Sequence, residues 1–370
     1  MTKIYLPHAE QFDSMNENLA KIANALCSNI DITSWAGIQK VVRVGVAPAL
    51  IPVGTQLAVN HSVYGTHLYD VVAHNYFKSA HDESAHSMTL LCHDVVTSIP
   101  YDAQEAFYYA DEGLSGGTYN FTHEKFGEWG AGTYQFTLGS SVPKGGHLVI
   151  AGDPSKSPLG RVEAYDSSGA LCGEADIILG NGGTSLGTCG VELNHIHRSI
   201  YGSNNYKESA IRQYLNSSGD FSWKPQTKFD RSPSEYPQRG FLGGLDSELQ
   251  LVIAEVIVPC VASNLYESPD SSVTKSTQYT VRDKVYLVSQ KEITGNTLDT
   301  FEDGTSRFTY YESATSADLI KYQNGGAVNW RTRSPGTAAA DRVRLITSDG
   351  SARYYGANHW VGIAPCFTIA

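Results

Sequence analysis

The chain has 370 residues, of which 41% are hydrophobic and 18% are charged, and its net charge is −11. This composition excludes wholesale disorder. The acidic balance excludes no fold, but it disfavours nucleic acid and anionic membranes as partners, because contact with phosphate groups requires a basic face. The length suits two or three domains, or one large domain that carries an insertion.

The beginning of the chain carries no targeting signal that we recognise. Residues 1–15 lack the apolar core of a signal peptide, and no run of eighteen apolar residues occurs anywhere. We therefore expect a soluble protein, made in the host cytoplasm, without membrane insertion. The six cysteines form no C-x-x-C pair, which favours buried reduced thiols over disulfides or a zinc site.

The first predicted element is a helix over residues 8–29. Its apolar side chains recur at spacings of three and four, as in the seam of a coiled coil: Phe12, Met15, Leu19, Ile22 and Leu26. Residues 1–40 are accordingly interpreted as an N-terminal helix for oligomerisation or docking. The alternative is an amphipathic helix that lies on its own domain.

Residues 41–104 are interpreted as the first part of the main domain. Val42, Val44 and Val46 alternate with other residues, which predicts a strand, and further strands are predicted at 57–59, 68–73 and 88–91. Residues 105–190 show a different sequence pattern. They contain short alternating runs between Gly, Ser and Pro turns without a helical period, which predicts a small all-β insertion.

Residues 191–370 are interpreted as the remainder of the main domain. One helix is predicted within residues 196–217, after a cap at Ser203, Asn204 and Asn205. Further helices are predicted at 246–254 and near 316–322, with strands at 256–261 and 285–288.

The last forty residues give the clearest local signal. Asp349-Gly350 separates the runs 342–347 and 352–355, which predicts a β-hairpin. A closing strand is predicted from Ile363 to Ile369. Between these scaffold positions lie polar, charged and aromatic residues of the kind that form adaptable binding surfaces on loops. The simpler reading is a solvated hairpin that ends the domain.

Five segments carry a resemblance to a known fold. They are ESAIRQYLN (208–216), DSELQ (246–250), RDKVYLVSQKEI (282–293), NWRTRSP (329–335) and VGIAPCFTI (361–369). In this order they resemble the C-type-lectin-like domain of the branch related to formylglycine-generating enzyme. The ending is similar to the variable proteins of diversity-generating retroelements. The resemblance implies an α+β fold, with a C-type-lectin-like domain, the all-β insertion and the N-terminal helix.

The resemblance also implies a ligand-binding region over residues 329–365. Trp330, Arg333, Pro335, Val343, Leu345 and Phe367 would be scaffold. The variable, ligand-binding residues would be Arg331, Thr337, Asp341, Arg344, Arg353, Tyr355, Asn358, His359 and Trp360. Relatives carry Trp-Trp-Leu before Arg-Ser-Pro, where this chain has Trp330-Arg331-Thr332. Either Arg331 and Thr332 belong to the variable surface, or the match is looser.

The function implied is that of a phage or prophage tail protein, carried in the virion, which binds a host receptor through a diversified C-terminal surface. Its expected partners are a host cell-surface protein or glycan, other phage tail proteins and further copies of itself, with a trimer favoured because avidity strengthens weak binding. The alternative is a structural baseplate or tail-fibre component without receptor specificity of its own. A third hypothesis is a glycan-degrading enzyme.

Enzymatic chemistry finds little support in the sequence. No P-loop or G-x-G-x-x-G occurs, and the acidic residues show no glycosidase-like arrangement. His195 and His197 could lie on one side of a strand, but no cysteine or carboxylate pattern near them completes a metal site. We therefore expect no catalytic residues, no metal and no cofactor.

Overall fold

The structure is a computed structural model that describes residues 31–82, 85–102, 105–110, 112–123, 132–152, 159–188, 204–219, 239–262, 277–295, 306–336 and 342–370. Among the described residues, strands account for 44% and helices for 18%, with several sheets and half-barrels. The predicted α+β class with a C-type-lectin-like domain is therefore wrong. The physical reason is that the described helices are short, with none longer than nine residues, so the sheets dominate.

The helices occupy the connections between strands. The α-helices are α2 (Trp35–Arg43), α3 (Ala47–Leu50), α4 (Ala210–Asn216), α5 (Phe241–Gly244), α6 (Ser247–Val252) and α7 (Gln290–Thr294). Shorter 3-10 turns are η2 (Tyr206–Glu208), η3 (Thr309–Tyr311) and η4 (Ser316–Leu319). The helix predicted within 196–217 corresponds to α4, but its cap is Ser209 and not Ser203, Asn204 or Asn205. The helix predicted at 246–254 corresponds to α6, and the one predicted near 316–322 is only the turn η4.

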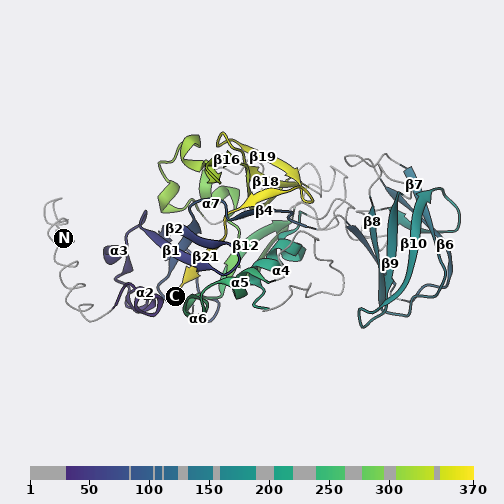
Figure 1. The fold of residues 1–370 in the computed structure, drawn as a ribbon, viewed down its shortest axis with the longest axis horizontal. Coiled ribbons are helices and arrows are strands. Elements are labelled where there is room, and N and C mark those ends of the chain that lie inside the picture. Colours follow the sequence, from purple (N-terminus) through teal and green to yellow (C-terminus); the bar gives the residue numbers. More distant parts are fainter. Residues whose placement is uncertain are drawn as a thin grey trace, which may run out of the picture.

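One five-stranded sheet joins the two ends of the described chain. Its order is β1 (Gln56–His61), β2 (Gly65–His74), β3 (Met88–Cys92), β21 (Cys366–Ile369) and β14 (Val285–Tyr286), and every pair is antiparallel. The C-terminal strand β21 thus lies between β3, from the early part of the chain, and β14, from its later part. This pairing fixes the end of the chain in the middle of the fold, as the labels β1, β2 and β21 show in Figure 1.

A second five-stranded sheet carries the C-terminal hairpin. Its order is β19 (Ala352–Gly356), β18 (Arg342–Ile346), β17 (Trp330–Pro335), β20 (Val361–Ile363) and β4 (Thr97–Ile99). Strands β17 and β20 are parallel, whereas the other neighbours are antiparallel. The predicted Asp-Gly hairpin is therefore present, and β19 lies at the outer edge of the sheet (Figure 1).

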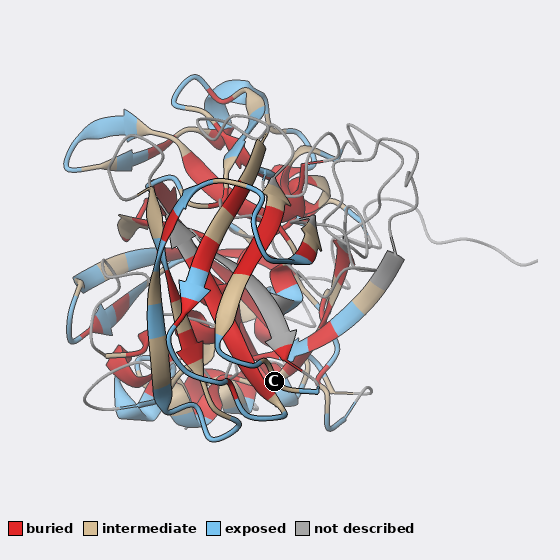
Figure 2. Cartoon of the chain, turned by 90° about the vertical axis from the view of Figure 1, so that its right-hand side faces the viewer, coloured by how far each residue is buried: buried red, intermediate tan, exposed pale blue. Residues whose placement is uncertain are grey.

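The segment predicted as an all-β insertion contains a seven-stranded sheet that lies beside the rest of the protein in Figure 1. Its order is β11 (Thr184–Thr188), β6 (Gly117–His123), β7 (Gly132–Leu138), β10 (Leu171–Leu179), β9 (Gly160–Tyr165), β8 (Gly146–Gly152) and β5 (Glu105–Ala110). It has a hydrophobic cluster of its own. In Figure 2 buried residues concentrate within the strands, and many exposed residues lie in the connecting turns.

Two further ribbons complete the main body. Strand β12 (Val256–Ala262) pairs with β13 (Thr277–Asp283), and β15 (Lys321–Gln323) pairs with β16 (Gly326–Val328). The closing strand predicted from 363 to 369 is interrupted at Pro365, so β20 and β21 belong to different sheets. Proline has no N–H group for a sheet, which explains the break.

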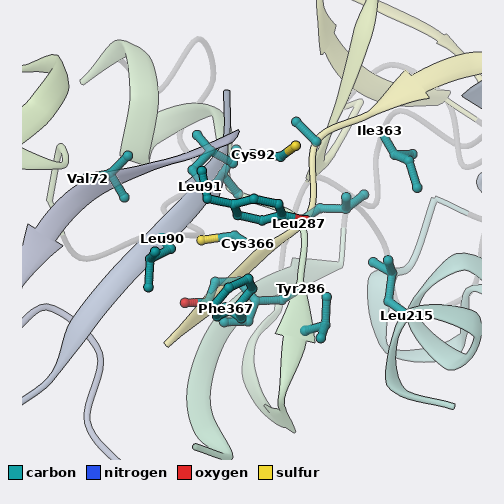
Figure 3. Packing of buried hydrophobic residues seen from close by; sticks show 14 of the residues in the cluster. Val72, Leu90, Leu91, Cys92, Leu215, Tyr286, Leu287, Ile363, Cys366 and Phe367 are labelled. Atoms are coloured by element: carbon teal, nitrogen blue, oxygen red, sulfur yellow. The ribbon is translucent and has the colours of Figure 1, made fainter. Parts of the chain in front are cut away.

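The larger hydrophobic cluster joins both five-stranded sheets to the helices of the main body. Tyr69 and Phe367 contact each other with ring centroids 5.1 Å apart, and Figure 3 shows Phe367 packed among residues of β3 and β14. Burial of such side chains contributes about 1.5–3 kcal/mol each. The end of the chain is therefore a central part of the core, which makes the hairpin before it part of a rigid frame.

The strand predicted at Val42, Val44 and Val46 is wrong, because this segment belongs to α2 and to the turn before α3. Ser34 caps α2 by accepting a hydrogen bond from the backbone N–H of Gly37. A strand would place the three valines on one face, whereas the helix buries Val42 and leaves Val44 58% exposed. Burial of one helix face overrides the local alternation.

Two predictions fall on parts of the chain outside the described residues. These are the helix over residues 8–29 and the pair His195 and His197. Among the helices that are described, none is both long enough and apolar enough to cross a lipid bilayer.

Candidate functional site

The hairpin of β18 and β19 carries much of the predicted ligand-binding region. Arg344 pairs with Tyr354, Leu345 with Arg353, and Val343 with Tyr355. Residues directly opposite each other in an antiparallel pair share a face of the sheet. Four of the five residues of β18 are buried, whereas Arg353, Tyr354 and Tyr355 on the edge strand β19 are exposed.

The turn of this hairpin is fixed by its own side chains. Gly350 has a φ of +79°, and a Cβ atom there would lie 1.8 Å from the carbonyl oxygen of Ser316, so only glycine fits. The Asp349 carboxylate accepts hydrogen bonds from the Thr347 hydroxyl and the Ser351 N–H. These bonds lower the pKa of Asp349 below its ordinary value. The tip is therefore well defined.

Five of the predicted ligand-binding residues lie on or next to β19 and have accessible side chains. Tyr355 is 47% exposed and Trp360 is 60% exposed, while Arg353 and His359 are also exposed and Asn358 is half-buried. The rings of Tyr355 and His359 contact each other edge to face, with centroids 5.6 Å apart. We call these five residues the hairpin surface.

Arg331, predicted as part of the ligand face, is completely buried. Its Nη2 donates to the carbonyl oxygens of Gly356 (2.6 Å) and His359 (3.0 Å), and its Nη1 reaches that of Tyr355 at 3.4 Å. Thr332 is buried as well. Both lie on β17, whose six residues are all buried, so neither side chain reaches the surface. Arg331 thus binds the backbone of the hairpin surface from the buried side of the loop, and we call this residue the clamp.

Arg344 is also largely covered, since it is only 9% exposed. Its guanidinium lies 5.3 Å from the ring centre of Tyr354, and that of Arg342 lies 5.1 Å from the same ring. Arg344 is therefore largely covered, whereas Arg342 at the beginning of the same strand is exposed. Thr337 and Asp341 fall outside the described residues.

A buried ion pair joins β17 to α7 beneath the hairpin. Arg333 and Glu292 are both fully buried at the ion pair, with 2.5 Å between Nη2 and Oε1. Arg333 also donates to the carbonyl oxygens of Pro259 and Leu287. Glu292 in turn caps α7 together with Ser289. The sequence analysis missed this pair, although Ser289-x-x-Glu292 is a readable capping-box pattern.

A hollow of about 550 Å³ lies between the hairpin tip and α7. Its polar lining comes from segments that are distant in the sequence and includes Gln290, Arg307, Ser316, Ser351 and Arg353. Only Arg353 was among the predicted binding residues. The others could not be found from sequence, because nothing local indicates that these segments meet.

The cysteines and potential metal ligands give no sign of a reactive centre in the described part of the chain. Burial raises the pKa of the Cys92 thiol to about 12 and also raises that of Cys366, so both remain protonated at neutral pH. The described cysteines are free. No three His, Cys, Asp or Glu side chains among the described residues lie together as a metal site would require.

Comparison with known proteins gives a family but no function. No curated protein and no solved structure matches the sequence. The profile of one family matches residues 175–370, which is more than half of the chain and includes the whole hairpin. The match leaves out β1 to β4, although β3 and β4 pair directly with the last two strands. The chain belongs to the family described as a domain of unknown function, DUF6273.

Proposed function

We propose that this protein is a phage or prophage tail protein that binds a molecule on the host surface through the hairpin surface. The observation that supports this most strongly is the exposure of Tyr355 and Trp360 next to a buried clamp. Tyr355 contacts His359, the neighbour of the exposed Trp360, and exposed apolar residues that form a patch mark interaction sites. Trp, Tyr and Arg are also the residues that contribute most to binding energy at protein interfaces.

Rigidity of the backbone supports the same proposal. Arg331 donates to the backbone carbonyl oxygens of Tyr355 and Gly356, at the end of β19, and of His359, in the loop that follows. A ligand therefore meets side chains whose backbone is already ordered. Binding to an ordered surface costs less conformational entropy, which favours affinity.

Diversification, if it acts on this gene, is proposed to be limited to positions that tolerate change. Arg353, Tyr355, Asn358, His359 and Trp360 can vary without disturbing the core. Arg331 and Arg344 cannot, because both side chains are buried, with Arg331 bonded to backbone carbonyl oxygens and Arg344 packed against the ring of Tyr354. Sequences of sibling copies test this, since variation spread evenly along the chain contradicts it.

The binding proposal is tested with the double variant Tyr355→Ala/Trp360→Ala. The purified full chain is incubated with cell envelopes from the bacterial strain that carries the gene, and the bound fraction is measured. We expect the double variant to lose most of the binding. Tyr322→Ala is the matched control, because Tyr322 is 46% exposed and its neighbour Gln323 contacts Ser98, at the opposite edge of the sheet.

The alternative function, a structural tail component, gives a different result in the same experiment. Removal of the two aromatic side chains would then prevent assembly into particles, while binding of the purified chain to envelopes would be equally weak for all variants. That outcome contradicts the receptor-binding proposal.

A further inference from the structure

We propose that the hollow between the hairpin tip and α7 is a binding site for an acidic sugar, meaning a hydroxylated ring that carries a carboxylate or a phosphate. This inference rests on the proposed function, since it names the class of ligand for the same end of the molecule. Its volume of about 550 Å³ lies within the range of about 300–1,000 Å³ that is usual for small-molecule sites.

The charge of the lining is opposite to that of the protein. The chain has 38 acidic and 27 basic residues. Among the described residues that line the hollow are two arginines, Arg307 and Arg353, and none of these described residues is an aspartate or glutamate. A concave site lined by one sign of charge concentrates ligands of the opposite sign. The hollow therefore favours an anion.

The two arginines are arranged differently, and both suit an anion. Arg307 is held in place because its guanidinium donates to the carbonyl oxygens of Ile293 (3.0 Å), Glu312 (3.1 Å) and Ala314 (3.1 Å). Carbonyl groups orient the guanidinium but leave its net charge in place. The exposed Arg353 side chain has no hydrogen bond or ion pair within the described part of the chain, so its planar fork is available for a carboxylate or phosphate.

The uncharged part of the lining indicates a hydroxylated ligand. Gln290 is only 5% exposed, and its Oε1 has no hydrogen-bond partner among the described residues. A buried acceptor without a partner costs about 1–3 kcal/mol, which a donor from a ligand can recover. Ser316 and Ser351 add hydroxyl groups to the lining. A sugar ring supplies several O–H donors together, which a simple inorganic anion does not.

The test is calorimetric titration of the full chain with D-glucuronate, glucose 6-phosphate and glucose. We expect saturable binding of at least one charged sugar, and binding of glucose at least about tenfold weaker. The first two ligands distinguish a carboxylate from a phosphate. Absence of saturable binding of both charged sugars at millimolar concentration overturns the proposal, and so does equal binding of glucose.

Variants locate the site. Arg353→Gln is expected to weaken binding of the charged sugar at least about tenfold, because it removes a charge-assisted contact. Gln290→Met, which has a similar shape but no amide, is expected to weaken it as well. Arg342→Gln is the matched control, since Arg342 is an exposed arginine of the same hairpin outside the lining. Unchanged binding in Arg353→Gln contradicts the proposal.

The failure of this inference can be separated from failure of the proposed function. If charged sugars do not bind while Tyr355→Ala/Trp360→Ala still abolishes envelope binding, the hollow is not the site and the receptor-binding proposal remains. If charged sugars bind and every variant still binds envelopes, the sugar site stands and the receptor-binding proposal fails.

Discussion

Replacement of Arg331 by methionine tests whether this residue is a clamp or a ligand contact. Methionine preserves most of the aliphatic packing of the arginine stem and removes only the guanidinium. Three backbone carbonyl oxygens, those of Tyr355, Gly356 and His359, then lose their charged donor. The change therefore acts on the loop from inside the protein.

The expected cost follows from these three bonds. Two of them, at 2.6 and 3.0 Å, are well formed, and the third is long at 3.4 Å. A hydrogen bond to a charged group contributes about 1.5–3 kcal/mol, while removal of a buried charge returns part of its desolvation penalty. We expect the free energy of unfolding to fall by about 2–4 kcal/mol.

Urea denaturation measures the loss of stability, and hydrogen exchange of the amides of residues 354–360 measures the loosening of the loop. Arg353→Met is the control, because an exposed arginine should change stability by no more than about 0.5 kcal/mol. If Arg331→Met unfolds at the same urea concentration as the wild type and yet loses envelope binding, Arg331 contacts the ligand and the clamp is refuted.

Three further predictions concern the frame. Glu292→Gln leaves Arg333 as a buried charge without its carboxylate, so the free energy of unfolding should fall by about 3–5 kcal/mol; a urea midpoint within error of wild type would contradict the ion pair. Burial lowers the pKa of His61 from 6.5 to about 4. Because the unfolded chain then binds more protons, stability should be complete above pH 6.5 and fall by up to about 3 kcal/mol toward pH 4. Urea midpoints across this pH range test it, and the slope should flatten in His61→Gln. Gly350→Ala should cost about 1–3 kcal/mol in thermal unfolding, since Cβ would meet Ser316; a neutral effect would show that the turn can shift.

The elements that depend mainly on local sequence, such as the hairpin turn and the alternating strands, were predicted correctly. The Asp349-Gly350 turn gave the hairpin, because its left-handed conformation suits glycine. The alternating runs that became β1, β2 and β3 were also predicted correctly. The segment at Val42–Val46 was not, because its helix depends on a cap at Ser34 and on burial against the core.

Ligand binding by the hairpin surface stays a prediction, and only the exposure of its residues can be compared with what the sequence suggested. Tyr355 and Trp360 are exposed as a ligand surface requires. Arg331 has the same chemistry as an exposed binding residue, but its side chain is buried against the backbone carbonyl oxygens of Gly356 and His359. That arrangement is set by long-range pairing, which no alternation within residues 329–335 reveals. The fold class was wrong for a related reason, since a resemblance in short segments does not fix how sheets assemble.

The most direct test of the central claim is the binding of the full chain to host envelopes, compared between wild type and Tyr355→Ala/Trp360→Ala. Both proteins should unfold at the same urea concentration, because both side chains are exposed. The account predicts that the double variant, although folded, binds at least about tenfold less than wild type, since aromatic anchors contribute 2 kcal/mol or more. Equal binding by the two folded proteins would contradict it.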